Sequence, residues 1–475
     1  MKPSKSIDSK PCFALRRFGG VGAGLAGVVL STLLLGCAGE PSKRPDIVVI
    51  TLDTVRADHL GFYGYSRPTT PFLDHLATES TVFERAIAQA AVTPVSHASI
   101  FTGLDPYHHG LRVLHGLVGN RLDESQTTMA EVLAAEGWKT AAFISAFPAG
   151  RAFGLEQGFD HFDDTLPHAD GSEVVDEDGT VNTGPSQRPA DQTVDAALSW
   201  LATLGEAEEP LFLWLHFFDP HDLRFLPPRD LVDLFPPAFE VREEVLRSIY
   251  DAEIRFVDGQ IERFFQAFRE RRSWDDTVVA VLADHGEGLG DHGWWSHGIL
   301  YQEQIRVPLL VRAPGRSAHR VQDLVRTIDL MPTVLELAGV ESRPAIDMDG
   351  MSLVPAMETG LLGEDRTAYA DSVNLLDYTR RDQPDRKDEK DDKLYSLQRG
   401  DLKLIYHQLQ PENSELYDLG SDPGERHDLA AERPDVLREM IAELKSRGAL
   451  SDLMPGMTPT DPEHAERLRS LGYIQ

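Results

Sequence analysis

The chain contains 475 residues, of which 41% are hydrophobic and 26% are charged. This balance is ordinary for a folded protein and excludes wholesale disorder, and the length suits one large α/β domain with an appendage, or two or three domains. There are 46 basic and 77 acidic residues, giving a formal net charge of -31, so we expect no nucleic-acid partner. The two cysteines, Cys12 and Cys37, exclude a disulfide framework and thiolate metal clusters.

The first 37 residues have the pattern of a secretory signal. Five basic side chains within residues 1–17 precede a short apolar stretch over 18–36. The stretch ends in Leu34-Leu35-Gly36-Cys37, which resembles the lipobox of bacterial lipoproteins, in which the cysteine is diacylated and becomes the mature N-terminus. We therefore expect lipidation at Cys37 and a protein outside the cytoplasm, tethered by lipid to a bacterial membrane in the periplasm or at the cell surface. The alternative is a plain membrane-anchor helix.

Three apolar segments that each lead to a carboxylate predict buried strands. Segment 47–52 runs into Asp53, 211–215 leads to Asp219, and 277–283 runs into Asp284. Continuous apolar strands of this kind suit a sheet that is covered on both faces. Because ligands bind beyond the carboxyl ends of strands in such sheets, we expect the three aspartates to converge on one crevice.

Helical patterns alternate with these strands, over residues 128–136, 191–204 and 243–271, and two further strands are expected at 140–145 and 307–312. The alternation predicts an α/β fold with a mostly parallel central sheet sandwiched by helices. After about residue 345, short strand-like pieces alternate with polar loops. We therefore divide the chain into a signal peptide (1–37), a catalytic α/β domain (38–345) and a smaller C-terminal α+β subdomain (346–475).

The segment 92–103 has the features of a short helix that begins beside a ligand. Thr93 is a natural N-cap, Pro94 suits the first helical position, and Gly103 could end the helix. A hydroxyl among the free N–H groups of a helix N-terminus suits an anion such as phosphate or sulfate. An ordinary N-cap has the same features, so this segment alone does not identify a site.

The segment 284–298 contains five glycines and three histidines within fifteen residues. Such a composition indicates a loop whose backbone approaches a ligand closely while imidazoles point inward. Asp284 and His285, at the end of a predicted strand, are plausible metal ligands. Asp219 and His221 follow another strand and could face one direction, although such a pair is often structural.

Taken together, these segments resemble the sulfatase family of the alkaline phosphatase superfamily, and the resemblance covers nearly all of the chain after the signal. No single motif carries the resemblance, but the order and spacing of nine short motifs together do. The motifs are 46–56 (DIVVITLDTVR), 71–74 (PFLD), 93–103 (TPVSHASIFTG), 250–258 (YDAEIRFVD), 284–290 (DHGEGLG), 306–309 (RVPL), 329–333 (DLMPT), 349–353 (DGMSL) and 416–419 (LYDL).

The chain departs from the family at the nucleophile. Typical sulfatases read C-x-P-S-R there, and the cysteine is oxidised to formylglycine, whereas this chain places Thr93 at the cysteine position, Ser96 at the serine and His97 at the arginine. Threonine cannot undergo that oxidation. Related members of the superfamily use an unmodified threonine to attack phosphate esters, so the resemblance implies Thr93 as a direct nucleophile.

A second departure concerns the metal, because family members usually have two adjacent aspartates where this chain has Asp53-Thr54. The resemblance implies a divalent cation held by Asp53, Thr93, Asp284 and His285. With one imidazole and fewer carboxylates, zinc or manganese is favoured, and calcium or magnesium remains open. Asp219, with His221 and His297, could hold a second metal.

A third departure lies at 144–147 (ISAF), where sulfatases carry a lysine and a histidine that contact sulfate. We therefore expect a metal-dependent hydrolase that cleaves sulfate or phosphate esters of small molecules or glycans. Thr93, His97, His221 and His297 are the expected catalytic residues, and Ser96, His221 and His297 are expected to contact the substrate.

Three alternatives remain open. The chain could be a phosphodiesterase or phosphonate hydrolase, a transferase of a phospho-group to cell-surface glycans, or an inactive sulfatase-fold protein that binds anionic polysaccharide. The sequence contains nothing that sets an oligomeric state.

Overall fold

The computed structural model describes residues 44–112, 121–166, 174–175, 181–182, 187–205, 209–221, 226–239, 241–340, 347–363, 365–373 and 392–450. These residues all belong to one compact unit, Arg44–Gln475. The predicted signal with Cys37, and the predicted boundary at 345, lie outside the described residues. Within the described ranges, no helix has both the length and the apolar character needed to cross a bilayer.

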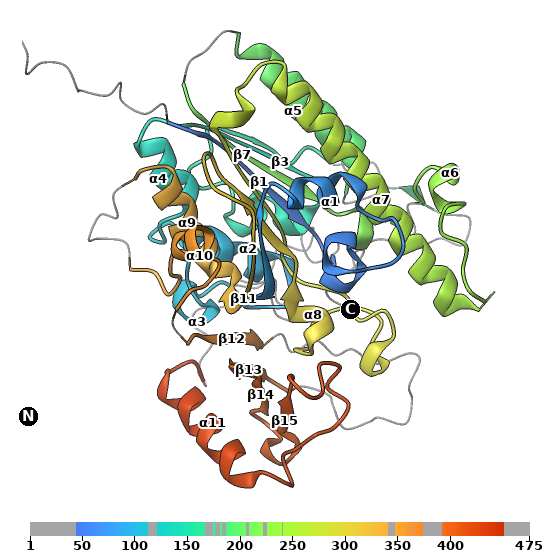
Figure 1. Cartoon of the computed structure of the whole chain (residues 1–475), viewed down its shortest axis with the longest axis vertical. Helices are drawn as coiled ribbons and strands as arrows, with labels where there is room; N and C mark the ends of the chain where they lie inside the picture. Colours follow the sequence, from blue (N-terminus) through green and yellow to red (C-terminus); the bar gives the residue numbers. More distant parts are fainter. Residues whose placement is uncertain are drawn as a thin grey trace, which may run out of the picture. The chain divides into compact units, whose positions relative to one another are not determined.

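A large central sheet forms the core of the unit (Figure 1). Its strands follow the order β11-β2-β10-β8-β1-β7-β3-β4, with β9 paired to β2. The strands are β1 (Asp46–Leu52), β2 (Thr81–Ile87), β3 (Lys139–Ile144), β4 (His161–Asp163), β7 (Leu211–Phe217), β8 (Thr277–Ala283), β9 (Arg306–Val307), β10 (Leu309–Arg312) and β11 (His319–Arg326).

The middle of the sheet is parallel, as the apolar segments predicted. β1 pairs in parallel with β7 and β8, and β7 pairs in parallel with β3. β10 instead runs antiparallel to both β8 and β2. The strand expected at 307–312 is divided into β9 and β10 at Pro308, because proline has no N–H group to donate to a sheet.

Helices cover both faces of this sheet, which confirms the predicted fold class. Figure 1 shows α1, α5 and α7 gathered on one face and α2, α4 and α9 on the other. The helices are α1 (Pro71–Ala77), α2 (Thr93–Thr102), α3 (Pro106–His109), α4 (Met129–Ala135), α5 (Ala190–Thr203), α6 (Arg229–Val232), α7 (Arg242–Arg269), α8 (Gln302–Ile305), α9 (Leu330–Leu337), α10 (Val354–Thr359) and α11 (Pro434–Ser446).

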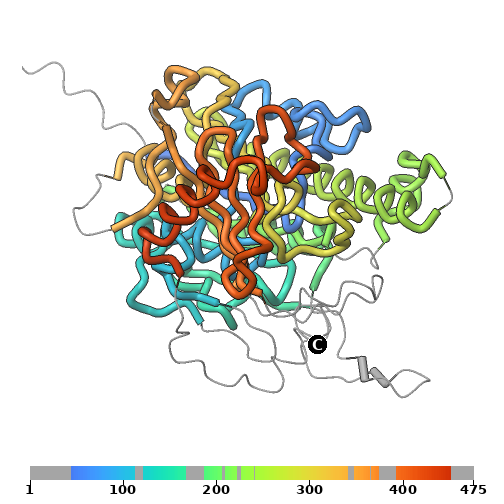
Figure 2. Tube along the Cα trace, turned by 90° about the horizontal axis from the view of Figure 1, so that it is seen from below, coloured from blue at the N-terminus to red at the C-terminus, as the bar shows by residue number. Residues whose placement is uncertain are grey.

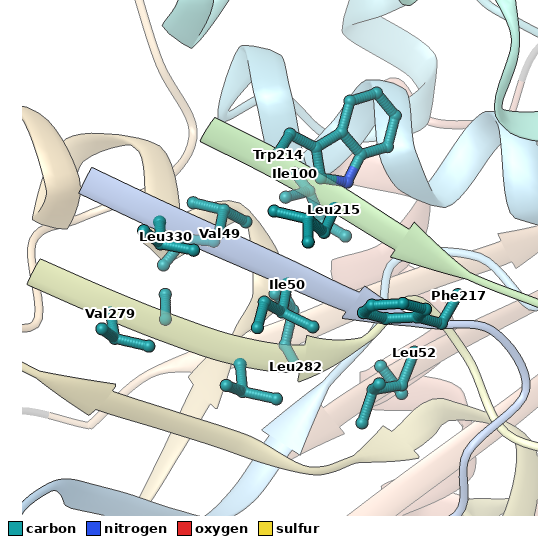
Figure 3. Close-up of a cluster of buried hydrophobic side chains, with 14 of the residues drawn as sticks. Val49, Ile50, Leu52, Ile100, Trp214, Leu215, Phe217, Val279, Leu282 and Leu330 are labelled. Atoms are coloured by element: carbon teal, nitrogen blue, oxygen red, sulfur yellow. The ribbon is translucent and has the colours of Figure 1, made fainter. Parts of the chain in front are cut away.

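The three predicted strands are buried along their whole length because helices cover both of their faces. Figure 3 shows the side chains of Val49, Ile50, Leu215, Phe217 and Leu282 packed around them. Burial of a large aliphatic or aromatic side chain contributes roughly 1.5–3 kcal/mol. This packing fixes the positions at which the polar residues leave the sheet.

A second, antiparallel sheet follows in the C-terminal part, as the short strand-like pieces predicted. Its order is β12-β13-β14-β15, and α11 packs against it. Figure 2 shows this part of the chain from below. The strands are β12 (Thr367–Ser372), β13 (Leu394–Arg399), β14 (Leu402–His407) and β15 (Glu415–Asp418), and a further pair is formed by β5 (Val174–Val175) and β6 (Val181–Asn182).

Glu425, which follows β15, joins this second sheet to the loop after β8. One carboxylate oxygen lies 2.6 Å from Nζ of Lys403, and both side chains are fully buried. The other accepts a hydrogen bond of 2.6 Å from the backbone N–H of Gln302. Its backbone carbonyl lies 3.1 Å from Nε2 of His292. The glycine- and histidine-rich segment is therefore bonded directly to the C-terminal part.

Candidate active site

Three ligand-type side chains meet where β1 and β8 end. Asp53 follows β1, and Asp284 and His285 follow β8, the neighbouring parallel strand. Their ligand atoms all lie within 4.8 Å of one another, and all three side chains are buried. The predicted convergence of strand ends is confirmed for these residues, and it follows from the register that pairs Leu52 with Ala283.

The group formed by Asp53, Asp284 and His285 contains two carboxyl groups and no side chain that is positively charged at pH 7. Burial raises the pKa of Asp53 well above its usual range, although the bond from Thr93 opposes the shift. Burial and the neighbouring Asp53 carboxylate raise the pKa of Asp284 to about 7. Burial lowers the pKa of His285 to about 4, so its imidazole is neutral at pH 7.

Thr93 places its hydroxyl against this group. Oγ1 donates to Oδ2 of Asp53 at 3.1 Å and lies 3.3 Å from Nε2 of His285. Thr93 is the first residue of α2 and Val92 is its N-cap, so the expectation that Thr93 caps the helix was one residue out. The hydroxyl is directed at the acidic group instead of at the helix backbone.

His285 presents an unprotonated nitrogen to the same point. Its Nδ1 lies 3.0 Å from the carbonyl oxygen of Gly286, which can only accept, so the proton resides on Nδ1. Nε2 therefore carries a lone pair and faces Thr93. This is the tautomer that a metal ligand requires.

Thr54 does not replace the second aspartate of the family. Its hydroxyl donates to the backbone carbonyl of Asp53 at 2.8 Å, and its φ of 57° lies in the left-handed region. Its backbone N–H donates to Asp284 at 3.3 Å. Thr54 thus turns the chain and supports Asp284, and its side-chain oxygen is directed away from the group.

His97 lies beneath the group and not in it. Its Nδ1 bonds the carbonyl oxygen of Thr93 at 2.8 Å, and its Nε2 bonds the hydroxyl of Thr51 at 3.0 Å. The side chain is fully buried, which lowers its pKa to about 4. The expected role in stabilising charge on a substrate therefore does not match this geometry, because both ring nitrogens are engaged within the protein.

Ser96 differs from expectation in the same way. Its hydroxyl donates to the backbone carbonyl of Asp284 at 2.6 Å, and the side chain is fully buried. The bond holds the start of α2 against the end of β8. Ser96 supports the site and its proton does not face a substrate.

His221 and His297 form a pair next to the group. Their Nε2 atoms lie 3.1 Å apart, and the ring of His297 lies 4.4 Å from that of His285. Nδ1 of His297 lies 2.8 Å from the carbonyl oxygen of Ala91, so that nitrogen carries a proton. The second metal expected at Asp219, His221 and His297 stays a prediction: the two histidines lie together, but the group of metal-type ligands found among the described residues is Asp53, Asp284 and His285.

Asp219 is not part of the three-residue group. Its Oδ1 accepts from the N–H of Ala190, the first residue of α5, at 2.9 Å. The expected convergence of three aspartates therefore extends to two, Asp53 and Asp284. Asp219 lies in the turn Asp219–His221 after β7, and that turn directs its side chain towards α5.

The family model for sulfatases matches residues 45–340, and the model for the C-terminal part of N-sulphoglucosamine sulphohydrolase matches residues 290–450. The chain belongs to the sulfatase family. It is 24% identical to the Δ4,5-hexuronate-2-O-sulfatase of Bacteroides thetaiotaomicron, over 84% of this chain and 87% of that protein. Sulfatase-family membership makes the chain a hydrolase that acts on ester bonds.

Solved structures share the fold. A protein bound to its substrate D-glucosamine-2-N,6-O-disulfate superimposes with a TM-score of 0.70 at 20% identity, over 87% of this chain and 100% of that chain. The phosphonate monoester hydrolase of Agrobacterium radiobacter does so with a TM-score of 0.67 at 21% identity, over 88% and 100%. The mixed sheet flanked by helices is therefore the sulfatase fold.

Sulfatase-family members depend on a metal, and the observed group fits a divalent cation. Among the described residues, Oδ1 of Asp53 and Oδ2 of Asp284 are buried and have no hydrogen-bond partner. Buried carboxylate oxygens without partners are costly unless a cation or a donor joins them. The residues that would hold the cation are Asp53, Asp284 and His285, with the hydroxyl of Thr93 adjacent.

Sequence reasoning missed the support beneath this sulfatase site. Trp214 donates from Nε1 to the hydroxyl of Thr51 at 2.9 Å, and Nε2 of His216 lies 3.3 Å from Oδ2 of Asp53. Thr51 lies two residues before Asp53, and Trp214 lies two before His216. Since side chains alternate along a strand, residues two apart lie on the same face of the sheet. This spacing was the signal in the sequence that could have placed Thr51 beside Asp53 and Trp214 beside His216.

Proposed function

We propose that this chain is a metal-dependent ester hydrolase that forms a covalent intermediate on Thr93. The observation that carries the proposal is the position of the Thr93 hydroxyl, 3.1 Å from Asp53 and 3.3 Å from His285 at the start of α2. That residue occupies the nucleophile position of the family motif. The divalent cation, when bound, supplies Lewis acidity that neutralises ester oxygens and lowers the pKa of the hydroxyl.

The residues of the chain account for each bond and proton. Oγ1 of Thr93 bonds to the phosphorus or sulfur atom, its proton moves towards Oδ2 of Asp53, and the bond to the alcohol oxygen breaks. The departing alcohol takes its proton from solvent, relayed through the neutral His221–His297 pair, because burial and the neighbouring His285 lower the pKa of His297. Water then displaces Thr93, which regains its proton from Asp53, while the proton lost by the water returns to solvent through the same pair.

The substrate is proposed to be a sulfate or phosphate ester of a small molecule or glycan, with phosphorus esters favoured. Threonine cannot become formylglycine, and His97, at the arginine position, is turned towards Thr51. The name of the Bacteroides relative supports a sulfated glycan, whereas that of the Agrobacterium structure supports a phosphorus ester. Zinc or manganese is the favoured metal because one of the ligands is an imidazole.

The decisive experiment combines metal analysis with a panel of aryl phosphate monoesters and diesters, phosphonate monoesters and aryl sulfates. Thr93→Ala should lower turnover by about a thousandfold or more, whereas Thr93→Ser should retain part of it. Intact-mass measurement after rapid quenching should find one phosphoryl or sulfuryl group on the wild-type chain and none on Thr93→Ala. Undiminished turnover by Thr93→Ala would remove the nucleophile assignment.

We also propose that the protein acts outside the cytoplasm, anchored through a diacylated Cys37. The supporting observation is the basic and apolar N-terminal pattern that ends in Leu34-Leu35-Gly36-Cys37. Membrane fractionation should find the wild-type chain with the membrane and Cys37→Ser in the soluble fraction. Equal membrane association of both chains would favour the anchor-helix alternative.

A further inference from the structure

The turn that leaves β1 has a strained backbone next to a metal ligand. Thr54, which directly follows Asp53, has a φ of 57°, in the left-handed region that β-branched residues rarely adopt. A residue persists in this region only when its surroundings hold it there. The position of the Asp53 carboxylate therefore depends on what holds Thr54.

Tyr250 of α7 holds this turn through its hydroxyl. Oη donates to the backbone carbonyl of Thr54 at 2.7 Å and accepts from the backbone N–H of Arg56 at 2.9 Å. The side chain of Tyr250 is fully buried, and no other described residue donates to the Thr54 carbonyl. A phenol can donate and accept at the same time, whereas phenylalanine can do neither. One buried hydroxyl thus ties the turn to α7 at two points.

Arg56 extends this support to the loop after β8. Its Nη1 lies 3.4 Å from the backbone carbonyl of Glu287 and 3.3 Å from that of Gly288. The same nitrogen lies 2.9 Å from Oδ2 of Asp291. Because His285 lies in the same loop, two residues before Glu287, the arginine joins the two segments that carry the metal ligands.

A separate contact keeps the rest of the segment after β1 attached to α7. Asp251, the neighbour of Tyr250, lies 2.7 Å from Nδ1 of His59 and 2.6 Å from Nη1 of Arg67. These bonds do not involve the hydroxyl of Tyr250, so they remain when that hydroxyl is removed. Its loss should therefore loosen the turn after β1 and leave the fold in place.

We propose that Tyr250, acting with Arg56, is a positioning residue for the divalent cation. Its hydroxyl sets where Asp53 stands relative to the ligands from the loop after β8, and so sets the affinity for the metal. This inference rests on the proposed metal-dependent function. Neither side chain is a ligand, because each acts through backbone groups. Residues that orient metal ligands typically contribute about 10- to 100-fold to metal affinity.

The test measures the affinity of the full chain for zinc by competition with a chromogenic chelator. Tyr250→Phe removes the hydroxyl and keeps the ring, and it should bind zinc about 10- to 100-fold more weakly than the wild type. Tyr63→Phe is the matched control, because Oη of Tyr63 also donates to one backbone carbonyl, that of Phe83, and accepts from one backbone N–H, that of Leu309. Those bonds join β2 to β10, which carry no ligand, so zinc affinity should change by less than about twofold.

A second pair of variants tests the contacts of Arg56, and it also carries the test if Tyr250→Phe does not fold. Arg56→Lys keeps the charge but lacks the fork that reaches several acceptors at once, so zinc binding should weaken about tenfold. Arg312→Lys is its control. Arg312 also donates to two backbone carbonyls, those of Trp274 and Thr277, both at 2.9 Å, and Thr277 begins β8 at the end away from the ligands. Arg312→Lys should keep wild-type affinity.

Thermal unfolding with a chelator present separates positioning from stability. The Tm of the metal-free chain should fall by a similar amount in Tyr250→Phe and Tyr63→Phe, because each loses the same pair of backbone contacts. Unchanged zinc affinity in Tyr250→Phe, or an equal loss of affinity in Tyr63→Phe, would overturn the inference and leave the hydrolase proposal intact. Weaker zinc binding in Tyr250→Phe, with no ester hydrolysed by the wild type, would instead contradict the hydrolase proposal and leave the positioning role standing.

Discussion

The Nε2 atom of His97 lies 3.0 Å from the hydroxyl oxygen of Thr51, and that oxygen also accepts a bond from Trp214. The carbonyl oxygen of Thr93 can only accept, so the proton of the His97 imidazole resides on Nδ1 and is donated to that carbonyl. Nε2 of the neutral imidazole therefore accepts the proton of the Thr51 hydroxyl. A chain of three side chains thus holds the backbone of the residue that carries the nucleophile.

Thr51→Val removes the hydroxyl but keeps the shape of the side chain. We expect kcat to fall about tenfold while KM changes by less than about twofold, because the change displaces Thr93 and leaves substrate contacts intact. Steady-state kinetics measures this split. Thr51→Ser restores the hydroxyl and should recover kcat. A rise in KM at constant kcat would place His97 at the substrate instead.

Asp284→Asn tests the metal group. We expect the purified variant to contain much less zinc or manganese than the wild type, as measured by elemental analysis, because a neutral amide replaces a charged ligand. A chelator should lower the Tm of the wild-type chain, and the added metal should restore it. The chelator should not change the Tm of Asp284→Asn. Asp195→Asn makes the same change at an exposed position of α5, so it serves as the control and should retain wild-type metal content.

Replacement of Gly286 and of Gly259 by alanine should change the free energy of unfolding in opposite directions. A Cβ atom at Gly286 would lie 2.0 Å from the carbonyl oxygen of Glu303, so Gly286→Ala should destabilise the chain by about 1–3 kcal/mol. At Gly259, inside α7, the nearest atom would be Nη1 of Arg255 at 3.9 Å. Gly259→Ala should therefore stabilise by about 0.5–1 kcal/mol. Denaturant unfolding measures both, and equal effects would contradict the packing around Gly286.

His407 makes the free energy of unfolding depend on pH. Burial disfavours its charged form, but Asp392 at 2.9 Å and Glu415 at 3.6 Å outweigh this and raise the pKa of His407 to about 9. A group whose pKa is raised on folding stabilises below its unfolded value, ~6.5 for histidine, and that contribution is lost as the pH rises through the folded value.

We therefore expect His407→Gln to be less stable than the wild type by on the order of 2 kcal/mol near pH 6, with the difference shrinking as the pH rises past about 9. The pKa values of Asp392 and Glu415 are lowered on folding, so their contribution disappears at acidic pH. Urea unfolding at a series of pH values measures the difference. A difference that grows from neutral to alkaline pH would show that His407 is uncharged in the native state.

The sequence was sufficient to predict the parallel middle of the sheet and the convergence of Asp53 with Asp284, because both depend on local pattern. Apolar runs that end at Asp53 and Asp284 predict adjacent parallel strands, and the register of β1 and β8 brings those ends together. The reversed direction of β10 was not predictable in this way, since a short apolar strand reads the same in either orientation.

The roles of individual polar residues were harder to predict. His97 stands at the position of a substrate-binding arginine, yet its partner Thr51 is 46 positions away in sequence, and the indole of Trp214 is 163 positions from Thr51. Asp219 follows a strand as Asp53 does, but a single turn directs it to Ala190. Such choices depend on long-range contacts that no local pattern records.

The bond from the carboxylate of Glu425 to the backbone of Gln302, with the contact between its carbonyl and His292, makes the loop after β8 depend on the C-terminal sheet for two of its contacts. Removing that sheet would leave the N–H of Gln302 and the ring of His292 without these acceptors. Because the same loop supplies His285 and His297, the folding of the C-terminal part also sets the order of the candidate site.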